Sequence, residues 1–397
     1  MEINEAKEKL LNSLSELDFG VEEVTLTNAI GRVSAEDVVS KVNVPSFPKS
    51  AMDGYAVCSE DIAGASEQNP VELKVISKLF AGETDKVDFE HFSSVRVMTG
   101  SIVPDGYDAV VMQEDTNYGE QSVLIKKEVK PYTNYCKVGE DIKIGETVIN
   151  KNAVINRTNI GTLASIGISE VKVYSKPKVG IVSTGSELVL LNSELEDGQI
   201  YSSISYMLKS QLKSLGIDAE ICVCSDNQDE IKDRVLEYLD RYDCVITTGG
   251  VSVGEKDLMP DVLKEIDADT VFSRVNIKPG TPTMASVKDG KLILSLSGNP
   301  FAALANFDYY FWDVLAKVTG NKNYKSKIIK ATLANDYEKL EKTKRLLRAK
   351  LDNCKAYLEK VNSSSVISNM SECNCYVLID ENKTYNVGDE VEVLIMK

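Results

Sequence analysis

The sequence has little histidine and no long apolar run. His91 is the single histidine among 397 residues, and it lies in a polar stretch ahead of an expected strand. We interpret it as a surface residue, so catalysis by a histidine-based triad is not expected. Since no run of about 18 apolar residues occurs, no membrane-spanning helix is expected. The first residues also lack the basic and apolar segments of a secretion signal. These absences favour a soluble, cytoplasmic protein.

Cysteine is present but not in the spacing of a zinc site. Four of the eight cysteines form two pairs, each separated by one residue: Cys222 with Cys224 and Cys373 with Cys375. On a strand such a pair lies on one face, which favours packing within a sheet over metal ligation, although ligation stays open as the alternative. Without a secretion signal the thiols are expected to be reduced.

The sequence lacks the excess of basic residues that a protein needs to bind nucleic acid. The formal net charge is −16, which repels nucleic acid and anionic membranes, so neither is expected as a partner. An anionic small molecule can still bind, but only in a pocket lined locally by cations or backbone amides. The 43% hydrophobic and 27% charged composition is that of a globular protein, and the length predicts several domains.

The hydrophobic pattern divides the chain into four parts. Residues 175–322 alternate apolar strands with helices, which predicts an α/β domain around a central parallel sheet. Residues 49–139 read as short strands broken by Gly and Pro, an inserted β-rich domain. Residues 1–48 and 140–174 form an elongated linker domain, and residues 323–397 a small C-terminal β-barrel-like domain. Within the linker domain, residues 1–17 predict a helix, with leucines up to Leu17, and Leu26 to Val39 a strand, a turn and a strand.

In an open parallel sheet, ligands bind beyond the carboxyl ends of the strands. The first such end here carries Thr184 and Glu187, a segment that by itself favours a solvated turn. The second carries Asp226, which is either the N-cap of the following helix or a ligand of hydrated Mg²⁺.

The third strand end is a glycine-rich loop, Gly249-Gly250-Val251-Ser252-Val253-Gly254, followed by Asp257 just before a helix start. It matches neither a dinucleotide fingerprint nor a P-loop, but its amides can converge on an anion, and Asp257 is suited to metal or base work. The fourth end is Ser297-Gly298-Asn299-Pro300, in which Asn299 and Pro300 suit the start of a helix. This predicts a free helix N-terminus that faces the same crevice.

Two cations lie between these last two ends. Arg274 and Lys278 are four residues apart on an expected extended segment, so they are predicted to point to the same side. One sheet edge is therefore expected to gather carboxylates, glycine loops, helix N-termini and cations. This combination predicts a site for phosphate and a divalent metal.

These segments, in this order, resemble the molybdopterin molybdenumtransferase family, which includes the E domain of gephyrin. The resemblance covers nearly the whole chain and is carried by several motifs: Pro45-Ser46-Phe47-Pro48, Ser50-Ala51-Met52-Asp53-Gly54-Tyr55, Met98-Thr99-Gly100, Asp108 to Asp115, Ser183-Thr184-Gly185, Gly198-Gln199-Ile200, Thr248 to Gly254 with Asp257, Lys278-Pro279-Gly280, and Gly298-Asn299-Pro300.

The resemblance implies an elongated homodimer of four-domain subunits that takes molybdopterin-AMP and molybdate as substrates, requires Mg²⁺, and inserts molybdenum into the dithiolene with release of AMP. Other cofactor-biosynthesis enzymes are further candidate partners. It implies Asp226 and Asp257 as Mg²⁺ ligands, the Val251–Val253 loop as a phosphate contact, and Arg274 and Lys278 as oxyanion contacts. Glu187 would orient water or the pterin. Asp53 and Thr99 would reach in from the partner subunit. The expected catalytic residues are Asp257, Asp226, Glu187 and Lys278, and the expected substrate-binding residues are Asp53, Thr99, Thr184, Gly249, Gly250, Val251, Ser252, Arg274, Ser297, Gly298, Asn299 and Pro300.

Three segments depart from the family pattern. Ser297 stands in place of Pro, Ile204 in place of Asn, and Ser363-Ser364-Ser365 in place of a Gly-Ser-His run. The loss of the Asn removes a hydrogen bond to ligand and leaves a molybdopterin-binding scaffold as an alternative function. A molybdopterin adenylyltransferase is a second alternative, and insertion of tungstate a third, because the two oxyanions share size and charge.

Overall fold

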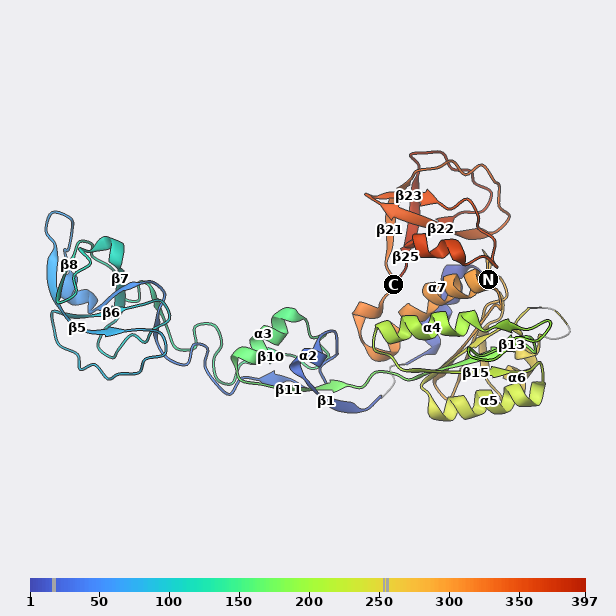
Figure 1. The fold of residues 1–397 in the computed structure, drawn as a ribbon, viewed down its shortest axis with the longest axis horizontal. Helices are drawn as coiled ribbons and strands as arrows, with labels where there is room; N and C mark the ends of the chain where they lie inside the picture. Colours follow the sequence, from blue (N-terminus) through green and yellow to red (C-terminus); the bar gives the residue numbers. More distant parts are fainter. Residues whose placement is uncertain (16–18, 253, 255–256) are drawn as a thin grey trace. The chain divides into compact units, whose positions relative to one another are not determined.

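The computed structural model describes residues 1–15, 19–252, 254 and 257–397. The chain divides into two compact units, each described below by itself (Figure 1). Unit 1 comprises Met1–Glu22 and Tyr174–Lys397, and unit 2 comprises Glu23–Val173. The expected positions Leu17 and Val253 lie outside the described residues.

Unit 1 is built around a mixed six-stranded sheet in the order β15-β12-β16-β20-β19-β17. Four neighbouring strands are parallel, as predicted: β15 (Ala219–Cys224), β12 (Val179–Thr184), β16 (Cys244–Thr248) and β20 (Lys291–Leu296). Two antiparallel strands extend one edge, β19 (Met284–Lys288) and β17 (Asp269–Phe272). β19 and β20 meet in a tight hairpin because Asp289 and Gly290 both adopt positive φ, as a two-residue turn of this type requires.

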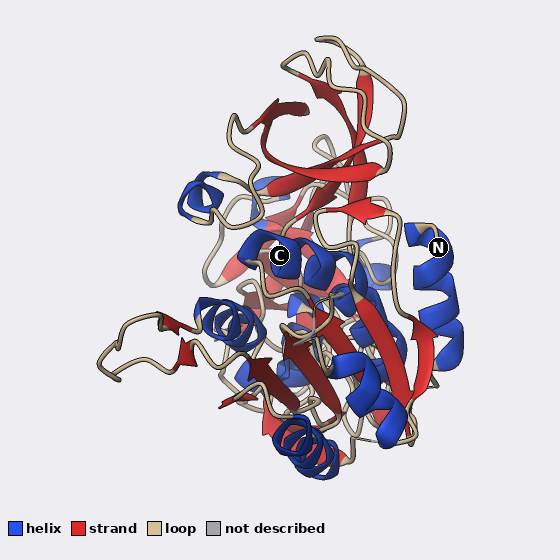
Figure 2. Cartoon of the chain, turned by 90° about the vertical axis from the view of Figure 1, so that its right-hand side faces the viewer, coloured by secondary structure: helices blue, strands red, loops and turns tan. Residues whose placement is uncertain are grey.

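Helices cover both faces of this sheet (Figure 2). Strand residues alternate between the two cores: Ile181 packs with α1 (Ile3–Ser13), α4 (Ser203–Ser214) and α7 (Pro300–Thr319), whereas Val182 packs with α5 (Gln228–Arg241) and α6 (Met259–Glu265). The nearly continuous apolar strands are therefore explained by burial on both sides. A small parallel pair, β13 (Leu188–Val189) with β14 (Ile200–Tyr201), follows β12. No described helix has the length and hydropathy that crossing a membrane requires.

The C-terminal part of unit 1 is a five-stranded closed barrel, which confirms the expected β-barrel-like end. Its strands are β21 (Ile328–Leu333), β22 (Lys344–Asp352), β23 (Lys355–Leu358), β24 (Cys375–Ile379) and β25 (Glu390–Ile395), and the pairing of β22 with β24 closes the ring. One short 3₁₀ turn precedes the barrel at Lys322–Tyr324, and another, Ser368–Glu372, lies between β23 and β24.

A short strand from the α/β part, β18 (Ile277–Lys278), adds to the edge of this barrel by pairing with β22. The buried α7 packs beneath the barrel: the Trp312 indole and the Tyr376 hydroxyl donate to the two oxygens of Asp308, at 2.8 and 2.9 Å. These contacts tie the barrel to the α/β sheet.

Unit 2 contains a five-stranded sheet in the order β7-β4-β6-β5-β8. Its strands are β4 (Gly54–Val57), β5 (Val71–Leu79), β6 (Ser93–Val97), β7 (Ala109–Met112) and β8 (Ser122–Ile125), with 3₁₀ turns at Ser59–Ile62 (η1) and Gln113–Asp115 (η2) and a two-stranded pair, β3 (Lys49–Ser50) with β9 (Tyr135–Cys136).

The remaining elements, most of whose residues belong to unit 2, are α2 (Leu26–Ala29), α3 (Arg157–Ser165) and two short strand pairs, β1 (Val21–Thr25) with β11 (Glu170–Tyr174) and β2 (Val38–Val39) with β10 (Thr147–Ile149). The prediction of a strand from Leu26 was wrong, because residues 26–29 form a helical turn. Ala29 is buried there in one cluster with Leu163 of α3, and this packing overrides the local preference for extended backbone.

Candidate functional site

A cavity of about 1050 Å³ lies beyond the carboxyl ends of the parallel strands in unit 1. We call it the strand-end cavity. All four strand ends singled out in the sequence contribute to its wall, as do the Lys278 segment and a loop of the C-terminal barrel. Its lining includes Thr184, Gly185, Glu187, Ile204, Asp226, Thr248, Gly249, Gly250, Val251, Ser252, Asp257, Lys278, Pro279, Gly280, Ser297, Gly298, Asn299, Pro300, Arg345, Asn362, Ser363, Ser364 and Ser365.

Asp226 faces the cavity and is not the cap of a helix. Its neighbour Asn227 caps α5, with the side-chain oxygen accepting from the Glu230 amide at 3.0 Å. Asp226 is instead tied to the first strand-end loop: its Oδ2 accepts from the Ser186 hydroxyl at 3.1 Å, and its own amide donates back to that hydroxyl at 3.0 Å. These contacts link the ends of β12 and β15 and orient the Asp226 carboxylate in the wall.

The backbone of the glycine loop after β16 packs closely against the end of β12. Gly249 has a φ of +90°, and a Cβ at this position would lie 2.5 Å from the Thr184 carbonyl oxygen, so only glycine fits. Beyond the loop, Asp257 is half-buried, and its Oδ2 accepts from the Gly254 amide at 2.6 Å. The loop therefore presents close-packed backbone together with an oriented carboxylate.

One backbone amide at the start of α7 is hydrogen-bonded by the barrel, which corrects the expectation of a free helix N-terminus. The Phe301 amide donates to the Ser364 carbonyl at 3.0 Å. Asn299 occupies the N-cap position without a side-chain cap bond, and its amide donates to the Ser297 hydroxyl at 3.2 Å. The serine run that departs from the family pattern is thus part of the cavity wall and contacts α7 directly.

Of the two predicted cations, Lys278 lines the cavity and Arg274 does not. Between them the chain turns: the Ile277 amide donates to the Val275 carbonyl at 2.9 Å, and the Val275 amide donates to Thr281. The expectation of one extended segment was therefore wrong, and Arg274 is exposed outside the lining.

Lys278 is placed by the backbone that follows it. Gly280 has a φ of +96°, and a Cβ there would meet the Asn306 amide nitrogen at 1.9 Å. That nitrogen donates to the Pro279 carbonyl at 3.0 Å, which fixes the segment onto α7.

The second cation of the cavity is Arg345, which the sequence reasoning missed. The β18–β22 register places Lys278 opposite Arg345, and the Arg345 guanidinium also donates to Glu341 at 2.6 Å. Nothing local marks Arg345, because it reaches the cavity only through a pairing between distant segments. Asn362 enters the lining on the same loop as the serine run.

Asp53 and Thr99 are neighbours within unit 2. Asp53 Oδ1 accepts from the Thr99 amide at 2.7 Å and from its hydroxyl at 2.8 Å, and these two bonds lower the pKa of Asp53. The motifs Asp53-Gly54 and Met98-Thr99-Gly100 are therefore joined by direct contacts.

Fold and cavity first define a class: a multidomain α/β enzyme with a mixed sheet, a closed C-terminal barrel and a candidate site beyond the strand ends. Three family descriptions match in succession: the MoeA N-terminal region (domain I and II) over residues 1–167, the probable molybdopterin binding domain over 180–317, and the MoeA C-terminal region (domain IV) over 330–396.

Individual relatives agree. A molybdopterin molybdenumtransferase of Staphylococcus epidermidis is 36% identical over 378 residues, which cover 94% of this chain and 90% of that protein. One of Staphylococcus aureus is 36% identical over 400 residues, covering 99% and 95%. The crystal structure of the molybdopterin biosynthesis protein MoeA of Pyrococcus horikoshii superposes with a TM-score of 0.83 at 30% identity, covering 100% of each chain. The chain belongs to the molybdopterin molybdenumtransferase family, transferases of molybdenum cofactor biosynthesis.

Proposed function

We propose that this chain inserts molybdate into adenylylated molybdopterin with Mg²⁺-dependent release of AMP. The observation that carries the proposal is that Glu187, Asp226, Asp257 and Lys278 line one cavity. Carboxylates, backbone amides and cations in one hollow suit a substrate that bears a pyrophosphate bridge and a second, oxyanionic substrate.

The aspartates fit a Mg²⁺ ion in their chemistry. Mg²⁺ prefers hard oxygen ligands and commonly takes one or two carboxylates together with substrate phosphates and water. Asp226 and Asp257 supply such oxygens. The Asp226 carboxylate is oriented by the Ser186 hydroxyl of the first strand-end loop, and the Asp257 carboxylate by the Gly254 amide of its own loop. Bound there, Mg²⁺ would neutralise charge on the pyrophosphate. The Asp226 and Asp257 carboxylates would hold the ion, backbone amides of the glycine loop would contact the phosphate oxygens, and Glu187 would orient the attacking water.

The glycine loop and the start of α7 are assigned to the pterin side of the substrate. Backbone amides and hydroxyls suit phosphate and pterin contacts, and the candidates are Thr184, Gly249, Gly250, Val251, Ser252, Ser297, Gly298, Asn299 and Pro300. Water cleaves the phosphoanhydride, so that AMP leaves and the phosphate stays on molybdopterin.

Lys278 and Arg345 are assigned to molybdate. Both are cations on adjoining strands of the wall, and charge-assisted hydrogen bonds to oxyanion oxygens are among the strongest in proteins. In the transfer, the two dithiolene thiols replace one oxo group of molybdate, and the displaced oxygen leaves as water with their protons. The oxidation state of molybdenum does not change in this step.

The proposal extends to the setting of the enzyme. We place it in the cytoplasm as a homodimer in which Asp53 and Thr99 of one subunit complete the site of the other, and other cofactor-biosynthesis enzymes as its partners. The pairing of Asp53 with Thr99 supports a role as a prearranged unit. The four-domain division with limits at 48, 139, 174 and 322 remains part of this proposal.

The test is AMP release from adenylylated molybdopterin by the purified chain, with molybdate, with tungstate and with neither. We expect release that molybdate stimulates, that a Mg²⁺ chelator stops, and that Asp257→Asn abolishes. Lys278→Ala removes a charge-assisted contact of roughly 1.5–3 kcal/mol and should raise the molybdate KM by about 10- to 150-fold.

Arg274→Ala is the matched control, because it removes a cation that lies outside the lining. It should behave as wild type. Binding of the adenylate without turnover would instead support a scaffold, and AMP transfer from ATP to free molybdopterin would support an adenylyltransferase. A tungstate-only response would identify a tungsten enzyme.

A further inference from the structure

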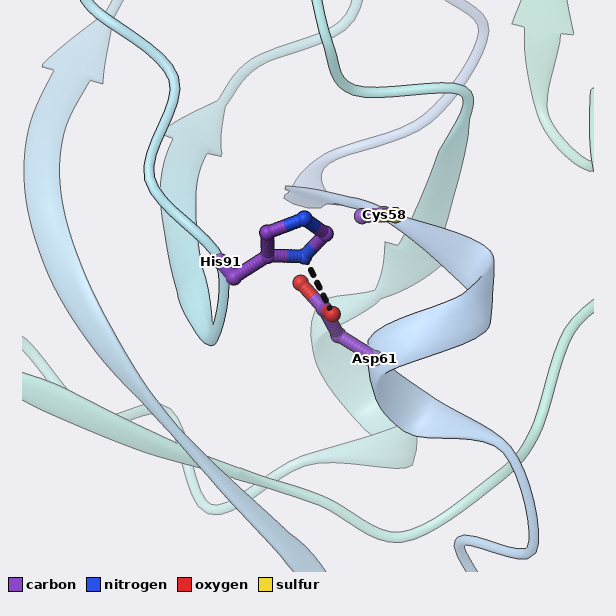
Figure 3. Close-up of side chains that lie close together, drawn as sticks. All are labelled: Cys58, Asp61 and His91. Atoms are coloured by element: carbon purple, nitrogen blue, oxygen red, sulfur yellow. Dashed lines mark hydrogen bonds and ion pairs between the residues drawn. The ribbon is translucent and has the colours of Figure 1, made fainter.

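A group of potential metal ligands lies in unit 2, apart from the residues that line the strand-end cavity. Within the described part of the chain it is the one set of three His, Cys, Asp or Glu side chains whose ligand atoms converge. Its members are Cys58, Asp61 and His91, and one ligand atom from each lies within 4.8 Å of the others (Figure 3). The chain's single histidine is therefore not isolated.

The backbone on both sides of this group is fixed by its own contacts. Cys58 immediately precedes η1 and Asp61 belongs to it. At the first residue of this turn, the Ser59 amide and hydroxyl donate to the two oxygens of Asp108, each at 2.7 Å. His91 precedes β6, and the next residue, Phe92, donates its amide to Asp61 Oδ2 at 2.9 Å. The turn after β4 and the turn before β6 are thus already joined through Asp61.

Asp61 also orients the imidazole. Its Oδ1 lies 2.8 Å from His91 Nδ1, and Figure 3 shows the ring directed toward the carboxylate. The Asp61 side chain is 6% exposed and the His91 side chain 67% exposed, so a buried carboxylate holds an accessible ring. Phe89 packs edge-on against the same ring, with centroids 5.1 Å apart.

The donor set selects the class of ion. A thiolate, an imidazole nitrogen and a carboxylate oxygen suit Zn²⁺ and similar borderline metals, and they are poor matches for Mg²⁺ or Ca²⁺, which prefer oxygen alone. Thiolate and carboxylate together carry two negative charges, which balance a divalent cation. Three protein ligands would leave the fourth position of a tetrahedral ion for water.

Binding of an ion requires small shifts of the ligand atoms. Tetrahedral Zn²⁺ with bonds of roughly 2.0–2.3 Å holds its ligand atoms roughly 3.3–3.6 Å apart. Asp61 Oδ1 and His91 Nδ1 are closer than this, at 2.8 Å, so the ion would replace their hydrogen bond and separate the two atoms slightly. No pair of ligand atoms is farther apart than 4.8 Å, so the remaining pairs need to close by at most about 1.5 Å. The exposed His91 side chain can make these shifts by rotation, while Cys58 and Asp61 stay on the fixed turn.

We propose that Cys58, Asp61 and His91 form an accessory binding site for Zn²⁺ or a similar divalent transition metal, which clips the η1 turn to the segment before β6. This site is independent of the proposed transferase function. An ion that binds the folded form stabilises it, so the consequence is a metal-dependent gain in the stability of unit 2.

The experiment is a Co²⁺ titration of the full-length, metal-free, reduced chain, followed by optical absorption. Co²⁺ reports a thiolate ligand by a charge-transfer band and tetrahedral geometry by intense visible bands. We expect both, with displacement by Zn²⁺, and at least about a 100-fold weaker Co²⁺ affinity in Cys58→Ser and in His91→Gln. Because His91 is exposed, His91→Gln should fold normally and keeps the test decisive if Cys58→Ser does not.

Cys136→Ser is the matched control: Cys136 is a half-buried cysteine of the same unit that does not belong to the group. It should leave the spectrum and the affinity unchanged. A wild-type chain without a thiolate band at millimolar Co²⁺ would overturn the proposal, as would bands that persist in both Cys58→Ser and His91→Gln. AMP release should be the same in all of these variants, so this result does not depend on the proposed function.

Discussion

Removal of the Arg348 guanidinium should destabilise the barrel loop that reaches the strand-end cavity. Arg348 is fully buried on β22. Its guanidinium donates to four acceptors of the 361–369 segment: the carbonyls of Val361, Ser363 and Val366 and the side-chain oxygen of Asn369. It also lies 4.3 Å from the centre of the Phe301 ring, at the start of α7. One side chain therefore holds the serine run against α7.

The expected loss of stability depends on which hydrogen-bond acceptors are left without a donor when the guanidinium is removed. Val361 and Ser363 each keep a second donor, the Asn369 amide group at 2.9 Å and the Val366 amide at 3.3 Å. The loss therefore falls on Val366 and Asn369, at roughly 1.5 kcal/mol for each charge-assisted bond. Loss of the buried cation–π contact adds about 1 kcal/mol. Arg348→Met, which keeps much of the volume, should cost about 4 kcal/mol.

The unfolding transition of unit 1 in a urea titration of the full-length chain measures this cost. Hydrogen exchange at the Phe301 amide reports the local effect, because that amide donates to Ser364. We expect a lower midpoint and faster exchange at Phe301. Lys350→Met, an exposed position on the same strand, should change stability by no more than about 0.5 kcal/mol. Equal stability of Arg348→Met and Lys350→Met, with Phe301 still protected, would refute the assigned role of Arg348.

Three further perturbations test other parts of the molecule. Asn227→Ala should cost about 1 kcal/mol of stability in a thermal melt, whereas Asp226→Asn should cost little, because Asn227 is the cap of α5; the reverse order would contradict this assignment. Gly280→Ala places a Cβ against Asn306 at a φ of +96°, so we expect a loss of about 1–3 kcal/mol together with slower AMP release, and an unchanged variant would argue against the tight contact. Burial raises the pKa of Asp308 to about 6, above an unfolded value of about 3.9. The folded state therefore binds more protons between these pH values, so the contribution of Asp308 to stability is present below about pH 4 and is lost as the pH rises through about 6. Urea titrations across this range should show wild type losing stability relative to Asp308→Asn, and parallel curves would contradict the raised pKa.

Much of unit 1 could be predicted because its physical signal is local. The apolar runs that became β12, β15, β16 and β20 are each short and bounded by turns, and the helices between them carry their own start and stop residues. The antiparallel edge was missed although the dipeptide Asp289-Gly290 is a strong hairpin signal.

The cavity was predictable as far as it depends on strand ends. In a parallel sheet the segments after β12, β15, β16 and β20 meet at one edge whatever the loops do, so Glu187, Asp226 and Asp257 could be grouped from the sequence. Arg345 could not, because its place depends on the register between β18 and β22. Arg274 was wrongly predicted to point to the same side as Lys278. The chain turns at Val275–Ile277 through backbone hydrogen bonds that cannot be predicted from the residue types.

The choice between Asp226 and Asn227 as a helix cap was open for a similar reason. Asp and Asn cap helices equally well, so the sequence does not show which of the two neighbours is the cap. The choice depends on which side chain faces the sheet edge in the folded chain. The contact of Asp226 with Ser186, forty positions earlier in the chain, decides it.

The placement of molybdate can be measured directly. Crystals grown with molybdate and recorded at the molybdenum absorption edge locate the metal by its anomalous signal. We expect the strongest peak in the strand-end cavity, in contact with both Lys278 and Arg345, and its loss in Lys278→Ala but not in Arg274→Ala. A peak outside the cavity, or one that survives Lys278→Ala unchanged, would contradict the proposed site.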